Sequence, residues 1–380
     1  MGLLDYYRQF EELSEEEERQ ELARRAAERK RLELERASDL DLSQTYWPEL
    51  PHPAVVQALT HAARSALQRY PDATALRRLL AERNGVGPSQ VVVGPGASYL
   101  LAGAARLLFG AGDRLVVPWP TYPLLARLGV EQGVVVEPVA IKGPALGEEA
   151  ASLVDQLLAA APASVKGVAL ASPNDPTGEL VGTAALERLA TGLAEGCWLF
   201  LDESLVEYAQ EQPSSQSLLA RFPRLLIFRT FSKAYGLAGL RIGYLLCSEP
   251  ASRTLAQLEP PLGVNGLSLA GAIEAIESLD GVLAQRRRQV GAERRFLAAQ
   301  LRRRGFAVQE GEGPFLWVSH PRAAAVAAAL AQRKVTVAKG EGLGFPSQLR
   351  ISCFERASSL RFLEVLDGVL ERQPSVQEGP

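Results

Sequence analysis

Apolar and polar residues follow two different rhythms along the middle of the chain. Short apolar runs bounded by glycine, proline and small polar residues are typical of buried strands. Between them, apolar positions recur every three or four residues, as in amphipathic helices. Strands are expected at 90–93, 114–117, 134–139, 167–171, 198–201, 225–228 and 242–247. Helices are expected at 54–67, 73–82, 153–160 and 184–193, near Ser217, and in the Ala/Leu-rich stretch that ends at Phe109.

The alternation of strands and helices predicts an α/β fold. A mostly parallel sheet covered by helices on both faces fits it, because parallel strands are buried on both sides. After Pro250 the pattern changes. A long helix at 267–301 is expected to lead to a small α+β domain, with strands at 315–319, 336–338 and 348–351 and helices at 323–333 and 358–371.

Five segments are therefore predicted. Residues 1–40 form a charged helical arm, and residues 41–53, rich in proline, form an extended link. Residues 54–260 form a large domain, and residues 261–372 form a small domain to which the N-terminal segment contributes. Residues 373–380 form a tail. The arm is interpreted as a solvated helix; the alternative is an arm that packs on a partner subunit or covers the active site.

Composition narrows the possible functions. The 380 residues carry a net charge of -3 with a pI of about 5.9, which gives no reason to expect nucleic-acid binding. No apolar segment is long enough to span a bilayer, so no membrane partner is expected. Cys197, Cys247 and Cys353 are few and far apart, which favours a reducing cytoplasm, and the three histidines form no metal-binding cluster.

Polar and small residues follow the predicted strands at the point where each strand ends. In open α/β sheets, ligands bind at the carboxyl ends of the strands. The residues at these ends therefore define the expected site: Gly96, Tyr122, Asn174, Asp175, Asp202 and Lys233.

The segment 228–244 holds the most informative of these residues. Lys233 stands at the mouth of a buried strand, where desolvation lowers a lysine's pKa, and a neutral amine can form a Schiff base with a carbonyl. Thr230 and Ser232 offer hydroxyl donors beside it, and Arg241 offers a guanidinium suited to phosphate. The alternative is a strand–turn–strand with a solvated lysine and arginine.

A second anion site is expected where the turn 94–98 leads from a strand into a helix. Backbone N–H groups and a helix N-terminus meet there, at Gly96, Ala97 and Ser98. Tyr99 occupies the third glycine position of a dinucleotide fingerprint, so that motif is excluded. A tight turn without a ligand is the alternative.

Together these residues suit a phosphorylated aromatic aldehyde. Asp202 is placed to pair with a pyridinium nitrogen, or alternatively to cap the next helix. Tyr122 is placed to stack on the ring. Arg350 lies between Leu349 and Ile351 and needs an anionic partner, either a structural acid or a substrate carboxylate.

Four motifs resemble the fold-type I pyridoxal-phosphate enzymes of the class I/II aminotransferases, and histidinol-phosphate aminotransferases in particular. They are Ser-Lys at 232–233 with Arg241 and Gly243, Asn-Asp-Pro-Thr-Gly at 174–178, Asp-Glu at 202–203 and Tyr-Pro-Asp at 70–72, within a resemblance that covers about 45–370.

The resemblance implies a homodimer with active sites at the subunit interface and pyridoxal phosphate as cofactor. Lys233 becomes the Schiff-base and proton-transfer lysine, and Asp202 the pyridinium partner. Tyr122 becomes the stacking ring. The phosphate cup is then formed by Ala97, Ser98, Thr230, Ser232 and Arg241. Tyr70 is expected to reach the neighbouring subunit's phosphate, and Arg350 to bind the substrate carboxylate or its equivalent.

Three departures from the family pattern accompany the match. Asp175 replaces the asparagine that bonds the cofactor's phenolic oxygen, and Leu205 replaces a tyrosine that contacts the same oxygen. The region around Tyr46 and Trp47 lacks the family's Asn-Glu-Asn-Pro run. We therefore hypothesise that the internal imine is more basic than in an ordinary transaminase, because a donor is lost and a carboxylate is gained.

The expected activity is amino-group transfer between an amino acid, or an amino-alcohol phosphate, and a 2-oxo acid. The first alternative keeps the cofactor but makes the enzyme a decarboxylase of phosphorylated amino acids, similar to the threonine-phosphate decarboxylases. The second alternative is a non-catalytic regulator that binds the cofactor.

Overall fold

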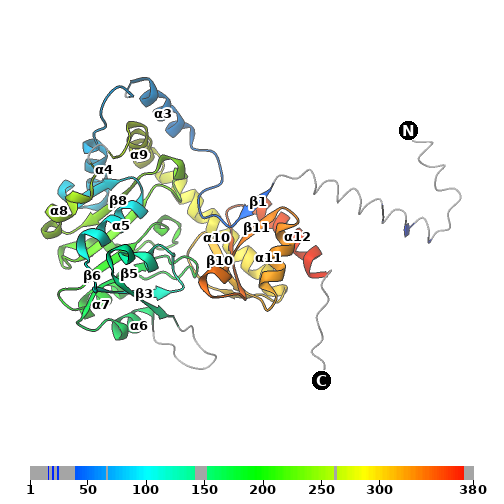
Figure 1. Ribbon diagram of the computed structural model, residues 1–380. Coiled ribbons are helices and arrows are strands. Elements are labelled where there is room, and N and C mark those ends of the chain that lie inside the picture. The colour runs from blue at the N-terminus through cyan, green and yellow to red at the C-terminus, as the bar shows by residue number, and fades with distance from the viewer. Residues whose placement is uncertain are drawn as a thin grey trace.

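A computed structural model describes residues 39–65, 67–141, 152–260 and 263–371, together with residues 16, 19, 20 and 24. Most of the predicted arm, and the tail after Gln373, lie outside the described residues. The described chain builds two sheets of unequal size, which Figure 1 shows as two lobes joined by a long helix, α10 (Asp280–Arg303).

The larger sheet has seven strands in the order β2-β8-β7-β6-β5-β3-β4. The strands are β2 (Val91–Gly94), β3 (Arg114–Trp119), β4 (Val135–Ala140), β5 (Val165–Ala171), β6 (Trp198–Asp202), β7 (Leu225–Thr230) and β8 (Gly243–Cys247). From β7 to β4 every neighbouring pair is parallel, whereas β8 runs antiparallel to both β7 and β2. The predicted mostly parallel sheet is therefore confirmed, with β8 as its one reversed strand.

Alternating residues of the strands bury two separate cores, one on each face of this sheet. Val91 and Val93 face one core and Val92 the other, as the two-residue period of a strand requires. The first face packs against α3 (Pro53–Ser65), α4 (Thr74–Asn84), α6 (Leu153–Ala160), α7 (Thr183–Gly192) and α9 (Gly266–Ser278). The second packs against α5 (Ala97–Leu108) and α8 (Glu249–Leu255). Both faces are apolar, which explains the unbroken apolar runs of the sequence.

The smaller sheet has five strands in the order β1-β11-β12-β10-β9. They are β1 (Leu40–Leu42), β9 (Ala307–Gln309), β10 (Phe315–Ser319), β11 (Val335–Lys339) and β12 (Gln348–Ser352). The C-terminal part of α10 packs with α11 (Ala323–Ala331) and α12 (Arg356–Glu371) over this sheet in a third core. Because β1 pairs with β11, the N-terminal segment contributes a strand to the C-terminal sheet.

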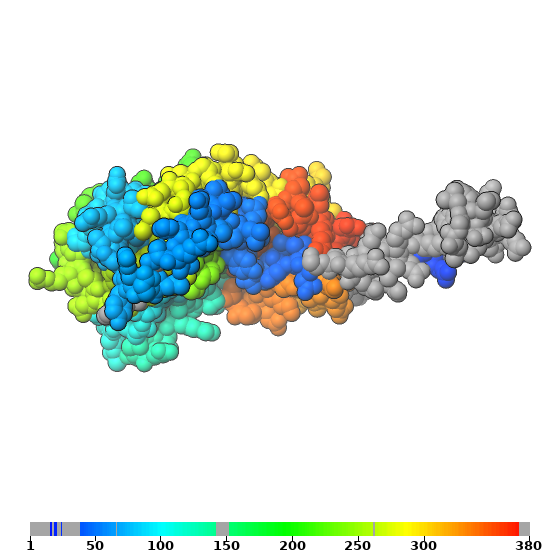
Figure 2. Space-filling view, turned by 90° about the horizontal axis from the view of Figure 1, so that it is seen from above, coloured from blue at the N-terminus to red at the C-terminus, as the bar shows by residue number. Residues whose placement is uncertain are grey.

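The structure corrects three details of the sequence prediction. The helix expected at 267–301 is two helices, because the chain leaves helical geometry at the fully buried Leu279, between α9 and α10. The link expected at 41–53 begins inside β1. The helix near Ser217 is a 3-10 segment, Ser215–Ala220. Figure 2 shows the blue segment around α3 crossing the surface between the cyan and green elements and the orange and red ones.

Candidate active site

A cavity of about 170 Å³ opens where β5, β6 and β7 end and α5 begins. It lies at the carboxyl ends of parallel strands, as the sequence predicts. Its lining contains most of the expected site residues: Ala97, Ser98, Tyr122, Ala171, Pro173, Asp175, Asp202, Ser204, Leu205, Thr230, Ser232, Lys233 and Arg241. Residues from six separate stretches of the sequence therefore meet around one space.

Lys233 lies just past the end of β7, half-buried in the cavity wall. Its Nζ donates a hydrogen bond of 2.5 Å to the hydroxyl of Thr45, a buried residue that follows β1. Burial lowers the pKa of the Lys233 amine, and Asp175 and Asp202 oppose that shift while Arg350 and Arg241 add to it. The neutral form of the Lys233 amine, which attacks carbonyls, is therefore more populated in this site than it would be in bulk water.

Asp202 ends β6 and is almost fully buried. Its Oδ1 accepts hydrogen bonds from the Ser204 backbone N–H at 2.9 Å and from the Ser204 hydroxyl at 2.5 Å. Burial raises the pKa of this carboxyl, partly countered by the Ser204 bonds and by the charge of Lys233. A buried carboxylate of this kind gains most from a cationic partner inside the cavity, and a protonated ring nitrogen would supply one.

The N-terminus of α5 forms an anion cradle beside Lys233. Gly96 precedes the helix with φ +94° and has no side chain that could cap it. Among the described residues this leaves the first-turn N–H groups available to a ligand. A Cβ added to Gly96 would lie 2.6 Å from Nη2 of Arg241, and one added to Gly243 would lie 2.6 Å from the amide nitrogen of Ala97. Glycine at both positions lets strand, helix and guanidinium close around a small anion.

Three side chains complete this cradle. The Thr230 hydroxyl lies 3.0 Å from the hydroxyl of Ser232, and Arg241 Nη1 donates to Ser232 Oγ at 3.3 Å. Arg241 has a positive φ of 49°, which is uncommon for a residue with a side chain. The strained backbone aims a guanidinium at the hydroxyls and at the α5 N-terminus, an arrangement suited to phosphate.

Two further lining residues differ in what they offer a ligand. Tyr122, in the loop after β3, lines the cavity and is 37% exposed, so its ring has an open face. Leu205, beyond β6, also lines the cavity and offers no hydrogen-bond donor.

Arg350 pairs with an acid of the protein, and its predicted role with a substrate carboxylate stays a prediction. It lies in β12, and its Nη1 forms an ion pair and hydrogen bond with Oδ1 of Asp175. Its Nη2 donates to the Ser43 carbonyl at 2.5 Å, and its guanidinium lies 5.2 Å from the centre of the Phe315 ring. The anionic partner of this arginine is thus an acid of the cavity wall itself.

Asn174 and Tyr70 do not line the cavity. Asn174 is buried in its own loop, where it accepts from Thr121 Oγ1 at 2.7 Å and donates to the Pro120 carbonyl and the Thr177 hydroxyl. Its amide holds the loop that presents Asp175. Tyr70 is 83% exposed ahead of α4, so its predicted role at a neighbouring subunit remains a prediction.

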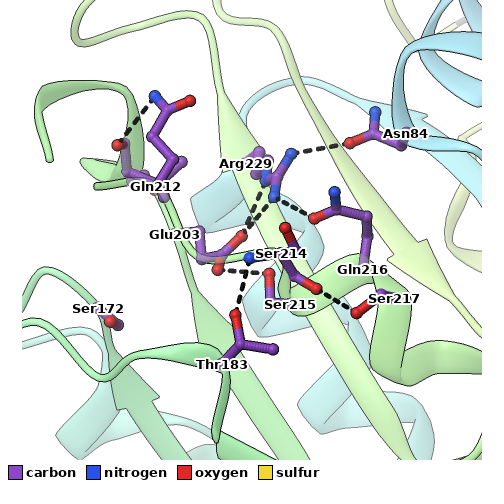
Figure 3. A network of polar contacts seen from close by, with 12 residues as sticks. Asn84, Ser172, Thr183, Glu203, Gln212, Ser214, Ser215, Gln216, Ser217 and Arg229 are labelled. Atoms are coloured by element: carbon purple, nitrogen blue, oxygen red, sulfur yellow. Dashed lines mark hydrogen bonds and ion pairs between the residues drawn. The ribbon is translucent and has the colours of Figure 1, made fainter. Parts of the chain in front are cut away.

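A buried polar network supports the chain just beyond Asp202. Glu203 turns its carboxylate away from the cavity and bonds Arg229 Nε at 2.9 Å and the Ser215 hydroxyl at 2.6 Å. Arg229 also donates to Asn84 at 2.8 Å and to Gln216 at 3.2 Å, and Figure 3 shows these side chains gathered around the guanidinium. The network fixes β6 and β7 side by side behind the two key residues.

Sequence reasoning missed two polar residues of this site. Thr45 contacts Lys233 although the two stand 188 positions apart, and nothing in its local sequence marks it as a site residue. Ser204 was detectable, because serine two residues after an aspartate commonly closes a local turn through its amide and hydroxyl.

The cavity fits pyridoxal phosphate by the chemistry of its donors. It combines a glycine cradle at a helix N-terminus for phosphate, a buried carboxylate for a ring nitrogen, and a desolvated lysine for an aldehyde. At the carboxyl ends of a mostly parallel sheet, this set defines a pyridoxal-phosphate-dependent enzyme of fold-type I.

Comparison with known proteins makes the assignment narrower. The family model "Aminotransferase class I and II" matches residues 38–366, and the chain belongs to that family. It is 35% identical to histidinol-phosphate aminotransferase 2 of Pseudomonas aeruginosa, over 89% of this chain and 91% of that protein. It is 29% identical to an aromatic amino acid aminotransferase of Corynebacterium efficiens, over 84% and 90% of the two chains.

Solved structures agree with the sequence comparisons. Histidinol-phosphate aminotransferase from Sinorhizobium meliloti, in complex with pyridoxal-5'-phosphate, is 25% identical and superposes with a TM-score of 0.77 over 89% of this chain and 93% of that one. The protein is a pyridoxal-phosphate-dependent aminotransferase, which makes the sequence prediction of the enzyme class and of the cofactor correct. Across the described ranges, no helix is both long and apolar enough to cross a bilayer.

Proposed function

We propose that this aminotransferase moves an amino group between an amino acid or amino-alcohol phosphate and a 2-oxo acid, with Lys233 as the residue that transfers the proton. The observation that carries the proposal is the meeting of Lys233, Asp202 and the cradle at Ala97 in one cavity. Several of the relatives are named histidinol-phosphate aminotransferases, which makes L-histidinol phosphate the first amino donor to test.

When bound, pyridoxal phosphate supplies an aldehyde that condenses with amines and a ring that stabilises the charge left after a Cα–H bond breaks. The protein's part is to hold and move protons around that group. Lys233, whose pKa burial lowers, would accept the proton from the donor's Cα as a general base. As a general acid it would then give the proton to the former aldehyde carbon, on the far side of the nitrogen. Asp202 would keep the ring nitrogen protonated by pairing with it.

The remaining residues bind and orient. Gly96 and the amides of Ala97 and Ser98 hold the phosphate together with Thr230, Ser232 and Arg241, so the reacting atoms sit at a fixed distance from Lys233. Tyr122 stacks on the ring face. Asp175 lines the cavity and would lie near the cofactor's phenolic oxygen, whereas Asn174 acts only through the loop that it holds.

The proposal extends to the oligomeric state and the cellular location of the enzyme. We infer a homodimer whose partner receives Tyr70, since Leu67, three residues before it, is 70% exposed and Leu50, ahead of α3, is 88% exposed. We also infer a cytoplasmic enzyme, because Cys197, Cys247 and Cys353 are buried and unpaired.

A half-reaction tests the proposed function. The protein, loaded with pyridoxal phosphate, is mixed with L-histidinol phosphate or with single amino acids, and the visible absorbance is followed. Loss of the aldehyde-form band and recovery of pyridoxamine phosphate is the expected result. Borohydride treatment before mixing should attach the cofactor to the peptide that contains Lys233, and the variant Lys233→Ala should give no adduct.

Three other outcomes would contradict the proposal. Release of carbon dioxide with the aldehyde form retained would make the protein a decarboxylase. Absence of any spectral change with every amine would favour a regulator. An adduct on a lysine other than Lys233 would displace the assigned residue.

A further inference from the structure

The ion pair between Asp175 and Arg350 joins the two sheets at the edge of the cavity. Asp175 comes from the loop after β5, lines the cavity and has a side chain 17% exposed. Arg350 comes from β12, with a side chain 16% exposed. Because both groups are largely withdrawn from water, their attraction is screened less than that of a surface pair.

The donors of Arg350 are already committed. Nη1 donates to Asp175 and Nη2 to the carbonyl of Ser43, while Nε is closed off from solvent and meets no hydrogen-bond acceptor within the described ranges. A carboxylate is held best by two adjacent N–H groups of one guanidinium. No edge of Arg350 offers two such groups without displacing Asp175 or the Ser43 carbonyl.

The charges around the cavity also disfavour a substrate carboxylate. Asp175 lies close enough to Lys233 to raise the pKa of its amine, and Asp202 has the same effect. A substrate α-carboxylate would add a third negative group, and Arg241 is taken up by the phosphate cradle. Like charges sharing one site cost binding free energy unless a cation separates them.

We propose that Asp175 is a specificity-determining residue: by occupying Arg350 it disfavours substrates with an α-carboxylate and favours amino donors with an uncharged substituent, such as a hydroxymethyl group, at that carbon. The inference rests on the proposed function, because it assigns a preference to the same amino-transfer site. The 2-oxo acid that accepts the amino group also carries a carboxylate. Its binding is therefore disfavoured by the same pairing of Asp175 with Arg350.

The matched donors L-histidinol and L-histidine test the preference, since they differ only in the group at Cα. Single-turnover conversion of the loaded enzyme is measured for both donors with the parent protein, with Asp175→Asn and with Glu179→Gln, a control that removes an acid of the same loop outside the cavity lining. Asp175→Asn should raise the ratio of the histidine rate constant to the histidinol rate constant by about tenfold or more, while Glu179→Gln leaves it unchanged.

An equilibrium measurement separates this inference from the proposed function. Imidazole-4-propionate carries the carboxylate but no amine, and its Kd is read from the cofactor's absorbance without turnover. Asp175→Asn should tighten binding by about tenfold or more. An unchanged Kd and an unchanged rate ratio would overturn the inference. Tighter binding in a protein that converts no amine at all would support the inference and refute the proposed function instead.

Discussion

Asp202 and Glu203 are neighbours in sequence, but their carboxylates lie on opposite sides of the large sheet. Asp202 lines the cavity and accepts from Ser204, whereas Glu203 pairs with Arg229 in the buried network behind it. Successive residues of a strand point to opposite faces, so one strand end supplies both a reactive group and its structural support. The two carboxylates therefore have separable effects when they are removed.

Removing Glu203 should destabilise the fold. Glu203→Ala leaves the guanidinium of Arg229 buried without its carboxylate, which costs about 3 kcal/mol or more. Urea unfolding should show a lower free energy of unfolding in this variant. Glu187→Ala breaks the exposed pair with Arg221 and serves as the control, with an expected loss below about 1 kcal/mol. Equal losses in the two variants would contradict the assigned role of the network.

Neutralising Asp202 should impair the reaction more than the fold. Asp202→Asn keeps the size of the side chain but removes the charge that would hold a ring nitrogen protonated. We expect kcat to fall on the order of a hundredfold or more at saturating cofactor, with an unfolding midpoint close to the parent's or above it, because burial already raises the pKa of this carboxyl. A variant that keeps its kcat would show that Asp202 does not pair with the ring.

Substitution of Gly96 tests the anion cradle, and Gly112 provides the control. Gly96 and Gly112 have positive φ values of +94° and +84°, but only at Gly96 would a Cβ meet a neighbour, Arg241 Nη2 at 2.6 Å. Both alanine variants carry backbone strain, and only Gly96→Ala displaces the guanidinium. The Kd for pyridoxal phosphate should rise about tenfold or more in Gly96→Ala and stay near the parent value in Gly112→Ala.

Asp175 should also change the titration of the nitrogen at Lys233. A nearby carboxylate favours the protonated form, so its charge raises that pKa, and Asp175→Asn should lower it. The measurement is a pH titration of the visible absorbance of the loaded enzyme, with Glu179→Gln as control. A higher pKa in Asp175→Asn would refute the hypothesis that this carboxylate makes the imine more basic.

Stability should depend on pH through Glu207. This residue is buried, its Oε2 has no hydrogen-bond partner in the described part of the chain, and burial raises its pKa from 4.5 to about 7. The folded state therefore binds the proton more tightly than the unfolded state, and stability falls as the pH rises from about 4.5 to 7.

Glu207→Gln removes this penalty. Relative to the parent protein, the variant should gain up to about 3 kcal/mol between pH 5 and pH 8, as measured by urea unfolding at each pH. Glu277→Gln, at an exposed position of α9, should give parallel curves. A variant that gains nothing on raising the pH would show that Glu207 is ionised in the folded protein.

Much of this architecture could be predicted from the sequence, because strands, their ends and helices are each indicated by a local pattern of residues. An unbroken apolar run followed by small polar residues indicates a parallel strand and its ligand-binding end. Lys233, Asp202 and Gly96 all follow that rule, and the structure places them or their neighbours around one cavity. The period of the apolar positions likewise predicted most helices to within a few residues.

Contacts between distant parts of the chain could not be predicted in the same way. The bond between Thr45 and Lys233 and the pair between Arg350 and Asp175 depend on how one sheet is placed against the other. A sequence period also cannot reveal that Leu279 interrupts a helix, because buried leucine is as compatible with a helix as with a helix junction.

The pairing of β1 with β11 has a mechanical consequence. Ser43 and Thr45 follow β1 directly, and Arg350 belongs to the same small sheet, so three groups beside the cavity are anchored by that sheet. A displacement of the small sheet relative to the large one would therefore change the contact between Lys233 and Thr45 and the pairing of Asp175 with Arg350 at the same time.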